Sequence, residues 1–416
     1  MTADETITRE GLAARDVADP LARFRDRFVL PAGLVYLDGN SLGAMPRAAA
    51  RRVGEVAGRE WAEGLIRSWN DAGWIDLAPR IGEKIGRIIG AAPASTMVAD
   101  STSVNLFKLL AAALRLRPGR RIILSEEGNF PTDLYIAQGL AALLGEGHEL
   151  RSVAAADIPA ALDENVAVMM LTHVNYHTGA MHDMAALTAQ AHARGALALW
   201  DLAHSAGAVP LALAAAGADL AVGCGYKFLN GGPGAPAFLH VAPALQAQIR
   251  YPITGWLAHA APFAFEPGFR PAPGIAAAAV GTPPVLSLAS LECGVDIALE
   301  APIDQVRATS LAQTALFMRL VEERCAGHGL AIVTPRDGQR RGSQVSLRHE
   351  SAWPIMQALI ARGVIGDFRA PDVLRFGITP LYLRHAELWD AVEVLRDILA
   401  TGAWRDPHYE ARRAVT

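Results

Sequence analysis

Cysteine is scarce in this chain: three of its 416 residues are cysteines. Cys224, Cys293 and Cys325 lie far apart and are odd in number, which excludes a disulfide framework and the paired spacing of a zinc site. Few cysteines without a pairing pattern are typical of a reducing compartment. We therefore expect a cytoplasmic protein that binds no metal.

Charge of one sign and long apolar runs are also lacking. Charged residues make up 19% of the chain, the formal net charge is −4 and no block of like charges occurs, which disfavours nucleic acid as a partner. The apolar run over 206–218 is interrupted by Pro210 and is too short to span a bilayer. The first ten residues, MTADETITRE, carry acids where a signal peptide needs bases. The sequence therefore predicts a soluble protein without a membrane partner.

The chain does have enough apolar sequence for a large core. Half of it is hydrophobic (51%), and 416 residues suffice for two or three domains. We predict an N-terminal segment over 1–50 that packs with a small C-terminal domain, a large domain over 51–284 and a small α+β domain over 285–416. A helix is expected over 19–28, followed by a short strand at 35–38.

The large domain alternates short apolar runs with helical patterns. This alternation is typical of right-handed βαβ units and a mostly parallel sheet, so we predict an α/β fold. The expected strands are 121–124, 166–172, 196–200, 219–224 and 237–241, and the expected helices are 106–116, 132–144 and 184–194. In the C-terminal part we expect helices at 286–300, 303–325, 352–362 and 385–399, and strands at 331–334, 344–347 and 373–378.

Two of the predicted parallel strands end at residues that carry chemistry. The run ALALW stops at Asp201, and the run DLAVGC stops at Tyr226 and Lys227 before a glycine-rich turn. Ligands of open α/β sheets bind at this carboxyl edge. A carboxylate for a protonated pyridine nitrogen beside an amine that can bind an aldehyde is the minimum equipment for pyridoxal phosphate chemistry. A strand-end lysine with its ammonium in solvent, and an acid paired with a structural arginine, are the plainer alternatives.

Other polar residues group around this edge. A serine- and threonine-rich stretch that includes Thr102 and Ser103 precedes an apolar helix, as in a helix N-terminus that binds phosphate. Thr172 ends another strand, and His204 follows Asp201 closely enough to face the same space. Phe130 precedes Pro131 at a helix start, where it either stacks on a cofactor ring or acts as an ordinary N-terminal staple.

Arg375 is the predicted holder of a substrate carboxylate. It lies in the strand-like run VLRFGI, and a guanidinium can bind a carboxylate through two parallel hydrogen bonds. Arg369 and Arg384 are rivals for this role.

Several longer motifs together resemble the kynureninase family, pyridoxal-phosphate enzymes of the aspartate aminotransferase fold type, and in particular its bacterial members. The resemblance covers nearly the whole chain in order, through YLDGNSLG, STSVNLFKLL, NFPTDLYIAQGL, LTHVNYHTG, WDLAHSAG, GYKFLNGGPG and RGVIGDFRAPDVLRFGITPLY. It implies a three-layer large domain with a mostly parallel sheet, a smaller α+β domain, pyridoxal 5′-phosphate as cofactor and a homodimer. General class V aminotransferases share the Asp, the His and the Lys, but not YLDGNSLG, NFPTDLY or YKFLNGGPG.

The resemblance also implies roles for individual residues. Lys227 would bind the cofactor covalently, Asp201 would hold the pyridine nitrogen, and Tyr226 would act beside Lys227 in catalysis. Phe130 would stack on the ring, while Asp133, Thr172 and His204 would make polar contacts to the cofactor. The phosphate would be held by Thr102, Ser103, Tyr226, Trp256 and Thr282, the last two from the neighbouring subunit. Arg375 would bind the substrate carboxylate, and Trp69 with Thr282 would contact the substrate ring, a pattern that favours unsubstituted kynurenine.

The family cleaves L-kynurenine with water to anthranilate and L-alanine, and also accepts 3-hydroxykynurenine. Two alternatives remain at this point. The first is another class V enzyme, an aminotransferase or a cysteine desulfurase; a desulfurase needs a cysteine in a mobile loop, whereas Cys325 lies in a helical pattern. The second is a catalytically silent protein, which would have no need of Lys227, Asp201 and Arg375 together.

Overall fold

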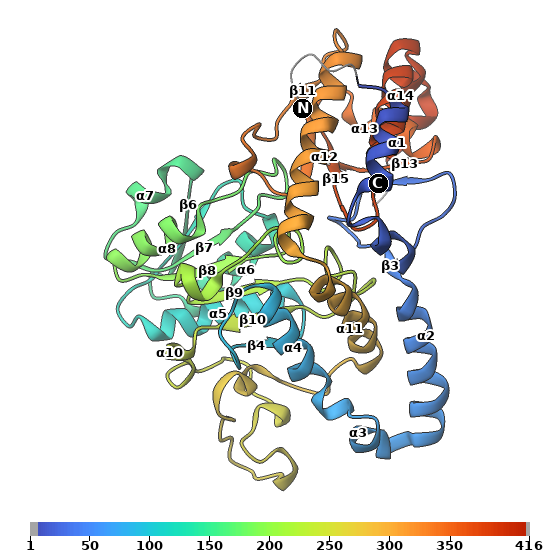
Figure 1. The fold of residues 1–416 in the computed structure, drawn as a ribbon. Helices are drawn as coiled ribbons and strands as arrows, with labels where there is room; N and C mark the ends of the chain where they lie inside the picture. Colours follow the sequence, from blue (N-terminus) through green and yellow to red (C-terminus); the bar gives the residue numbers. More distant parts are fainter. Residues whose placement is uncertain (1–6, 413–416) are drawn as a thin grey trace. The chain divides into compact units, whose positions relative to one another are not determined.

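The computed structural model describes residues 7–412, so the ends of the expected N-terminal segment and C-terminal domain (1–6 and 413–416) lie outside the described residues. The chain divides into two compact units (Figure 1). Of the described residues, unit 1 comprises 7–47, 177–180 and 300–412, and unit 2 comprises 48–176 and 181–299. None of the helices within residues 7–412 is long and apolar enough to cross a membrane.

Unit 2 is built on a seven-stranded sheet of order β4-β10-β9-β8-β7-β5-β6. The strands from β9 to β6 in this order run parallel, whereas β10 is antiparallel to both β9 and β4. The strands are β4 (Thr96–Val98), β5 (Ile122–Glu126), β6 (Glu149–Val153), β7 (Val166–Thr172), β8 (Leu197–Asp201), β9 (Leu220–Gly223) and β10 (Phe238–Val241). The α/β fold with a mostly parallel sheet is thus confirmed.

Alternation along the central strands separates the two faces of this sheet. In β8, Leu197 and Leu199 belong to the apolar cluster under α5 and α6, whereas Ala198 and Trp200 belong to the cluster under α4, α8 and α11. The result is a three-layer arrangement of helices, sheet and helices (Figure 1). The helices of this unit are α2 (Arg47–Glu55), α3 (Ser68–Asp71), α4 (Leu77–Ile88), α5 (Thr102–Leu116), α6 (Pro131–Leu144), α7 (Ile158–Ala161), α8 (Met184–Ala193), α9 (Leu213–Ala216), α10 (Pro243–Gln246) and α11 (Val285–Glu300).

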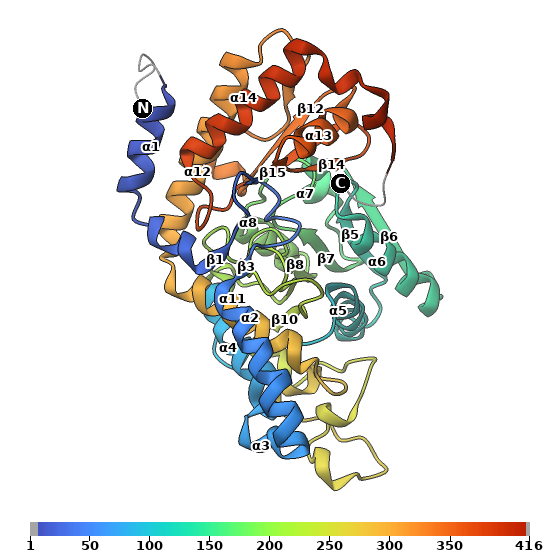
Figure 2. The ribbon, with the colours of Figure 1, turned by 90° about the vertical axis from the view of Figure 1, so that its right-hand side faces the viewer.

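Unit 1 combines an antiparallel sheet with long helices. Its sheet has the order β11-β12-β15-β14, and α12 and α13 pack against it (Figure 2). The N-terminal segment joins this unit, because β2 pairs with β13 and α1 packs on α14. The elements are α1 (Arg9–Ala18), β1 (Phe28–Val29), β2 (Val35–Tyr36), β3 (Met45–Pro46), α12 (Ile303–Arg324), β11 (Ala331–Ile332), β12 (Gln344–Arg348), α13 (Ala352–Ala361), β13 (Val364–Ile365), β14 (Asp367–Arg369), β15 (Val373–Gly377) and α14 (His385–Thr401).

Two sequence-based expectations need correction. The helix expected over 19–28 was wrong: the α-helix is α1, capped by the Thr8 hydroxyl, and Pro20 separates it from a 3-10 helix at Ala22–Arg27. The boundary expected at 284/285 also differs, since α11 up to Leu299 belongs to unit 2. Its Leu288, Leu291 and Val295 complete the apolar cluster on one face of the seven-stranded sheet.

Candidate active site

The carboxyl ends of neighbouring strands in unit 2 surround one cavity of about 530 Å³. Parallel strands end at the same edge of the sheet, so the loops after β5, β7, β8 and β9 converge there. Nine residues singled out in the sequence line this cavity, namely Thr102, Ser103, Phe130, Asp133, Thr172, Asp201, His204, Tyr226 and Lys227. The structure thus brings these nine of the predicted cofactor residues together.

Lys227 is the lysine that reaches this cavity. The sequence holds only two other lysines, and both are engaged elsewhere in unit 2. Lys84 Nζ lies 2.8 Å from a Glu292 carboxylate oxygen and 2.6 Å from one of Asp296, while Lys108 Nζ lies 2.7 Å from Asp100 Oδ2. An amine nucleophile in this cavity is therefore Lys227.

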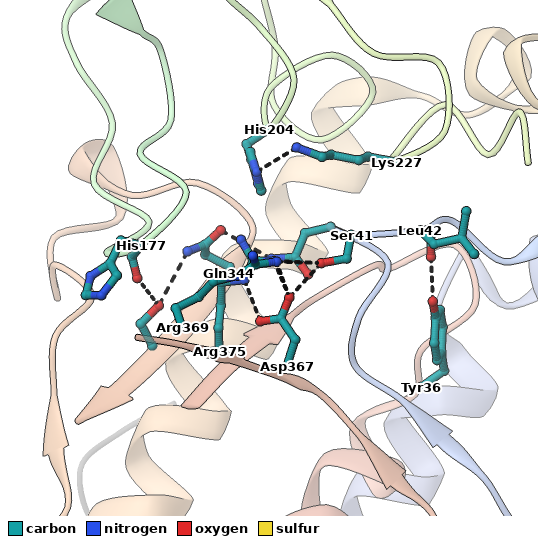
Figure 3. Close-up of polar contacts among 12 residues, drawn as sticks. Tyr36, Ser41, Leu42, His177, His204, Lys227, Gln344, Asp367, Arg369 and Arg375 are labelled. Carbon is teal, nitrogen blue, oxygen red and sulfur yellow. Dashed lines mark hydrogen bonds and ion pairs between the residues drawn. The ribbon is translucent and has the colours of Figure 1, made fainter. Parts of the chain in front are cut away.

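The Lys227 amine contacts the ring of His204. The distance between Lys227 Nζ and His204 Nε2 is 3.0 Å, and Figure 3 shows the lysine side chain pointing toward the imidazole. An ammonium group offers only hydrogen, so a charged Lys227 pairs with His204 when the imidazole Nε2 is the acceptor. The Lys227 Nζ also lies 5.9 Å from the centre of the Phe130 ring and 6.0 Å from that of Tyr226.

Asp133 and Asp201 form a buried pair of carboxyls. Their side chains are 1% and 3% exposed, and a hydrogen bond joins them. Burial raises the pKa of Asp133 well above its usual range, and the charge of Asp201 raises it further. Burial also raises the pKa of Asp201, whereas Lys227 and the backbone N–H of Ala203, 2.8 Å from Asp201 Oδ1, act in the opposite direction. A cationic partner at Asp201 would therefore stabilise the charged form of this carboxyl.

The start of α5 provides the donors for an anion. Ser101 caps the helix by accepting the Val104 N–H at 3.3 Å, and the hydroxyls of Thr102 and Ser103 are at its first turn beside the cavity. The unpaired N–H groups of a helix N-terminus favour a phosphate. Behind this turn, buried Lys108 donates to Asp100 and, at 2.8 Å, to the carbonyl of Ala278. These two bonds hold the loop before α5, which contains Asp100, in place.

Two aromatic residues line the same space. Phe130 stands just before Pro131 at the start of α6, and its ring meets that of Tyr176 edge-on with centres 5.1 Å apart. The charge of neighbouring Cys224 and burial raise the pKa of Tyr226, so its phenol keeps its proton at neutral pH. Tyr226 can therefore donate a proton or a hydrogen bond beside Lys227.

Three predicted residues lie elsewhere in unit 2. Trp69, Trp256 and Thr282 are not among the described residues that line the Lys227 cavity. Trp69 meets Trp256 edge-on with ring centres 6.5 Å apart, and Thr282 lines a second cavity of about 380 Å³. That Trp256 and Thr282 serve a neighbouring subunit stays a prediction, and so does the contact of Trp69 with the substrate ring.

Arg375 belongs to unit 1, where it is buried in a network of charges. It pairs through Nε and Nη2 with Asp367, and its Nη2 also donates to Ser41 Oγ at 2.6 Å (Figure 3). Burial pushes the pKa of Asp367 upward, but Arg375 and Arg369 outweigh this and lower it. Asp367 is therefore the anionic partner that holds the Arg375 guanidinium in place.

The rivals of Arg375 differ from it in their surroundings. Arg369 shares the network, since its Nη2 lies 2.6 Å from Asp367 Oδ2 and 3.2 Å from Ser41 Oγ, but its side chain is one-third exposed (32%). Arg384 lies at the N-terminus of α14, outside this network. Arg375 is thus the most firmly positioned guanidinium of the three.

Sequence reasoning missed the residues that support this machinery. Asp367 was not singled out, although β14 and β15 place it directly opposite Arg375, and recognition of that hairpin would have found it. Asn129, 2% exposed between Thr172 and Phe130, begins the motif NFPTDLY but was given no role, because its contact with Thr172 is formed only by the fold.

Comparison with known proteins places the chain in a family. It is 56% identical to the kynureninase of Burkholderia pseudomallei over 98% of this chain and all of that protein. It is 52% identical to the kynureninase of Pseudomonas fluorescens with the same coverage. The chain belongs to the kynureninase family. The family model of the kynureninase C-terminal domain matches residues 306–395 of this kynureninase-family chain.

Solved structures with low sequence identity share the fold of this kynureninase family member. One is a C-DES mutant with glycine covalently linked to the PLP cofactor, at a TM-score of 0.79 and 19% identity, covering 90% of this chain and 99% of that one. Another is a cysteine desulfurase from Thermococcus onnurineus, at a TM-score of 0.77 and 16% identity, covering 91% and 98%. The fold is therefore that of the type I pyridoxal-phosphate enzymes.

Proposed function

We propose that this protein is a pyridoxal-phosphate-dependent kynureninase that hydrolyses L-kynurenine to anthranilate and L-alanine. The observation that carries the proposal is the cavity in which Lys227, the Asp133–Asp201 pair and the N-terminus of α5 converge. Family membership at 52–56% identity over the chain supplies the substrate. 3-Hydroxykynurenine is proposed as a second substrate, and degradation of tryptophan with supply of precursor for NAD as the setting.

The residues present fit this cofactor. Thr102 and Ser103 offer hydroxyls and helix N–H groups for its phosphate, Asp201 offers a carboxylate for the ring nitrogen, and Phe130 offers a face for the ring. His204 and Thr172 add polar contacts around it. Bound there, pyridoxal phosphate supplies an aldehyde for amines and a ring that accepts electrons from the substrate.

The chain's own groups then perform the proton transfers. The Lys227 amine, free of the cofactor while substrate is bound, would remove the proton from the substrate Cα. Water adds to the side-chain ketone, the Cβ–Cγ bond breaks with its electrons left on Cβ, and anthranilate leaves with the hydroxyl of the water in its carboxyl group. The proton of that water goes to Cβ and the proton held by Lys227 returns to Cα, and the two together complete L-alanine. Tyr226, whose raised pKa keeps its phenol protonated, is the proposed acid for the carbonyl and for Cβ. Arg375 is proposed to bind the α-carboxylate and so to orient the substrate.

The alternatives from the sequence are less favoured. Full-length relatives at 52–56% identity are kynureninases rather than aminotransferases or desulfurases. Cys325, the cysteine considered for a desulfurase, is buried directly after α12 and not in an open loop. We further propose that the enzyme acts as a homodimer in the cytoplasm, which agrees with its three free cysteines.

One experiment tests the proposal directly. Purified protein loaded with pyridoxal phosphate is incubated with L-kynurenine, and the release of fluorescent anthranilate is followed. We expect turnover by the wild type and none by Lys227→Ala, with Lys84→Ala as the matched lysine control that retains turnover. A wild-type protein that binds the cofactor but leaves kynurenine intact would refute the proposed function.

A further inference from the structure

A chain of buried hydrogen bonds runs behind the proposed cofactor site in unit 2. It leads from Ser125 on β5 through Asn129 to Thr172 at the end of β7, and from there to Asp133 and Asp201. Each of these five residues is no more than 3% exposed. Because water has so little access, the hydrogens in this chain can be assigned by counting donors and acceptors.

The amide of Asn129 has only one orientation that satisfies its neighbours. The backbone N–H of Phe130 lies 2.7 Å from Asn129 Oδ1 and can only donate, so this atom must be the oxygen. Asn129 Nδ2 donates to Ser125 Oγ at 3.0 Å, and the Ser125 hydrogen goes to the carbonyl of Met170 at 2.7 Å. Asn129 therefore presents an oxygen, not an N–H, to the hydroxyl of Thr172.

This orientation determines what Thr172 can do for Asp133. A hydroxyl has one hydrogen, and that of Thr172 is taken by Asn129 Oδ1. Thr172 Oγ1 also lies within 3.4 Å of Asp133 Oδ2, but its single hydrogen cannot serve this longer contact while it is donated to Asn129, so it then faces Asp133 with lone pairs. An ionised Asp133 would face these lone pairs and receive no hydrogen bond from Thr172. A protonated Asp133 carries no negative charge and avoids this repulsion. Asp201, in contrast, receives the N–H of Ala203 at 2.8 Å, which favours its ionised form.

We propose that Asn129 is a positioning residue which, by taking the hydrogen of Thr172, keeps the proton of the buried carboxyl pair on Asp133 and leaves Asp201 ionised for the cofactor's ring nitrogen. This inference rests on the proposed function for the identity of the cofactor. The net direction of the pKa shift agrees with it, since burial and the charge of Asp201 raise the pKa of Asp133 well above its usual range and outweigh the groups that lower it. Three titratable groups face the pair. Lys227 lowers the pKa of both carboxyls, Cys224 has a pKa raised by burial, and Tyr226 has a pKa that the charges of Cys224 and Asp201 raise together with burial.

The test reads the protonation of the cofactor ring directly. Holoenzyme is prepared with pyridoxal phosphate labelled with nitrogen-15 in its ring, and the nitrogen chemical shift is recorded together with the dissociation constant of the cofactor. In Asn129→Ala the Thr172 hydrogen is free to turn to Asp133, so the proton moves toward Asp201. We expect the ring nitrogen to lose its protonated shift and the dissociation constant to rise about 10- to 100-fold, as for loss of one charge-assisted hydrogen bond.

A second variant separates this role from a merely structural one. In Asn129→Ala combined with Thr172→Val, no hydroxyl remains to stabilise an ionised Asp133, so the ring nitrogen should return to the wild-type shift. If Asn129 had a merely structural role, the second substitution would instead move the ring-nitrogen shift further from that of the wild type than Asn129→Ala alone does. Asn129→Leu, closer in volume, takes the place of Asn129→Ala if that variant does not fold, with the same expectation. Ser125→Ala leaves the oxygen of Asn129 in place and serves as the matched control.

Two results would overturn the inference. One is a wild-type ring-nitrogen shift in Asn129→Ala or Asn129→Leu, and the other is a double variant no closer to the wild type than the single one. Failure of the proposed function is distinguishable, because it would show as wild-type holoenzyme that does not cleave kynurenine, whatever the nitrogen shift.

Discussion

Asp133 with Asp201, and Asp38 with Asp367, are two pairs of largely buried acids that are stabilised in different ways. The first pair lies beside a single lysine and is most stable when it holds a proton. In unit 1, Arg375 and Arg369 compensate the negative charge of Asp367. Burial and this charge disfavour a second negative charge on Asp38 and raise its pKa. Each pair therefore contains one acid, Asp133 or Asp38, whose neutral form is favoured.

Asp38 should make the stability of unit 1 depend on pH. Burial and the nearby Asp367 raise the pKa of Asp38 to about 8. The unfolded chain releases this proton near about pH 4, so between the two values the folded state binds more protons and its stability falls as pH rises. Asp38→Asn has no proton to release. The melting temperature of Asp38→Asn relative to that of the wild type should therefore rise between about pH 5 and about pH 9. The rise should be about 2 °C or more for each kcal/mol of unfolding free energy that the wild type loses.

Calorimetry across this pH range checks the prediction, with Asp71→Asn, at an exposed position, as the control for loss of a surface carboxyl. A melting-temperature difference between Asp38→Asn and the wild type that stays constant with pH would contradict a raised pKa at Asp38.

Tyr226 should contribute to turnover through its hydroxyl. Neighbouring Cys224 and burial raise its pKa, so it can act as an acid across the neutral range but not as a base. Tyr226→Phe keeps the ring and removes the proton, and we expect kcat to fall by about 10²- to 10⁴-fold. Steady-state release of anthranilate measures this, with Tyr135→Phe, a substitution at an exposed position of α6, as the control. A kcat within a factor of about two of the wild type would exclude Tyr226 as the acid.

At the level of elements, α11 supports the loop that carries Lys227. A Cβ on Gly294 would come within 2.0 Å of the carbonyl oxygen of Leu229, two residues beyond Lys227. Gly294→Ala should therefore displace this loop, destabilise the protein by about 1–3 kcal/mol and reduce kcat. Gly139→Ala is the matched control in α6, since its Cβ would meet nothing within 4 Å, and it should stabilise by about 0.5–1 kcal/mol.

Chemical denaturation and anthranilate release on the two glycine variants check this pair of expectations. Equal behaviour of Gly294→Ala and Gly139→Ala would show that the α11 contact does not hold the loop.

Elements with strong periodicity were predictable, and elements formed by tertiary contacts were not. The apolar run over 166–172 matches β7 at both ends, because a strand buried on both faces reads as a continuous apolar run. By contrast β6 (Glu149–Val153), at the edge of the sheet and with a charged start, has no such run and was not predicted. The helix near the N-terminus was misplaced because its start depends on the single hydroxyl of Thr8.

The same limit applies to the site. Residues at strand ends, such as Asp201 and Lys227, could be found because the sheet edge is implied by the strand pattern. Asn129, Ser41 and Asp367 act through partners at least 43 positions away or across a hairpin, and such pairings exist only after the chain has folded. The roles of Trp69, Trp256 and Thr282 depend on the family resemblance, and these roles and that of Arg375 stay predictions.

At the scale of the whole molecule, the proposed homodimer predicts that each site uses residues of both chains. Trp256 does not line the Lys227 cavity among the described residues, although both belong to unit 2. If Trp256 completes the neighbour's site, a hybrid of one Lys227→Ala chain and one Trp256→Ala chain contains one site with both defects and one intact site. We therefore expect the purified hybrid to show about half of the wild-type activity, while each parent homodimer is impaired.

A reciprocal hybrid makes this result decisive. A chain that carries both Lys227→Ala and Trp256→Ala, paired with a wild-type chain, leaves no intact site if Trp256 acts across the dimer. The same hybrid retains one intact site if Trp256 acts within its own chain, so the two arrangements predict opposite orders of activity for the two hybrids. Co-expression with two affinity tags yields both hybrids, and their anthranilate release at equal cofactor loading gives the order. Higher activity in the reciprocal hybrid would assign Trp256 to its own chain and remove the reason to expect a shared site.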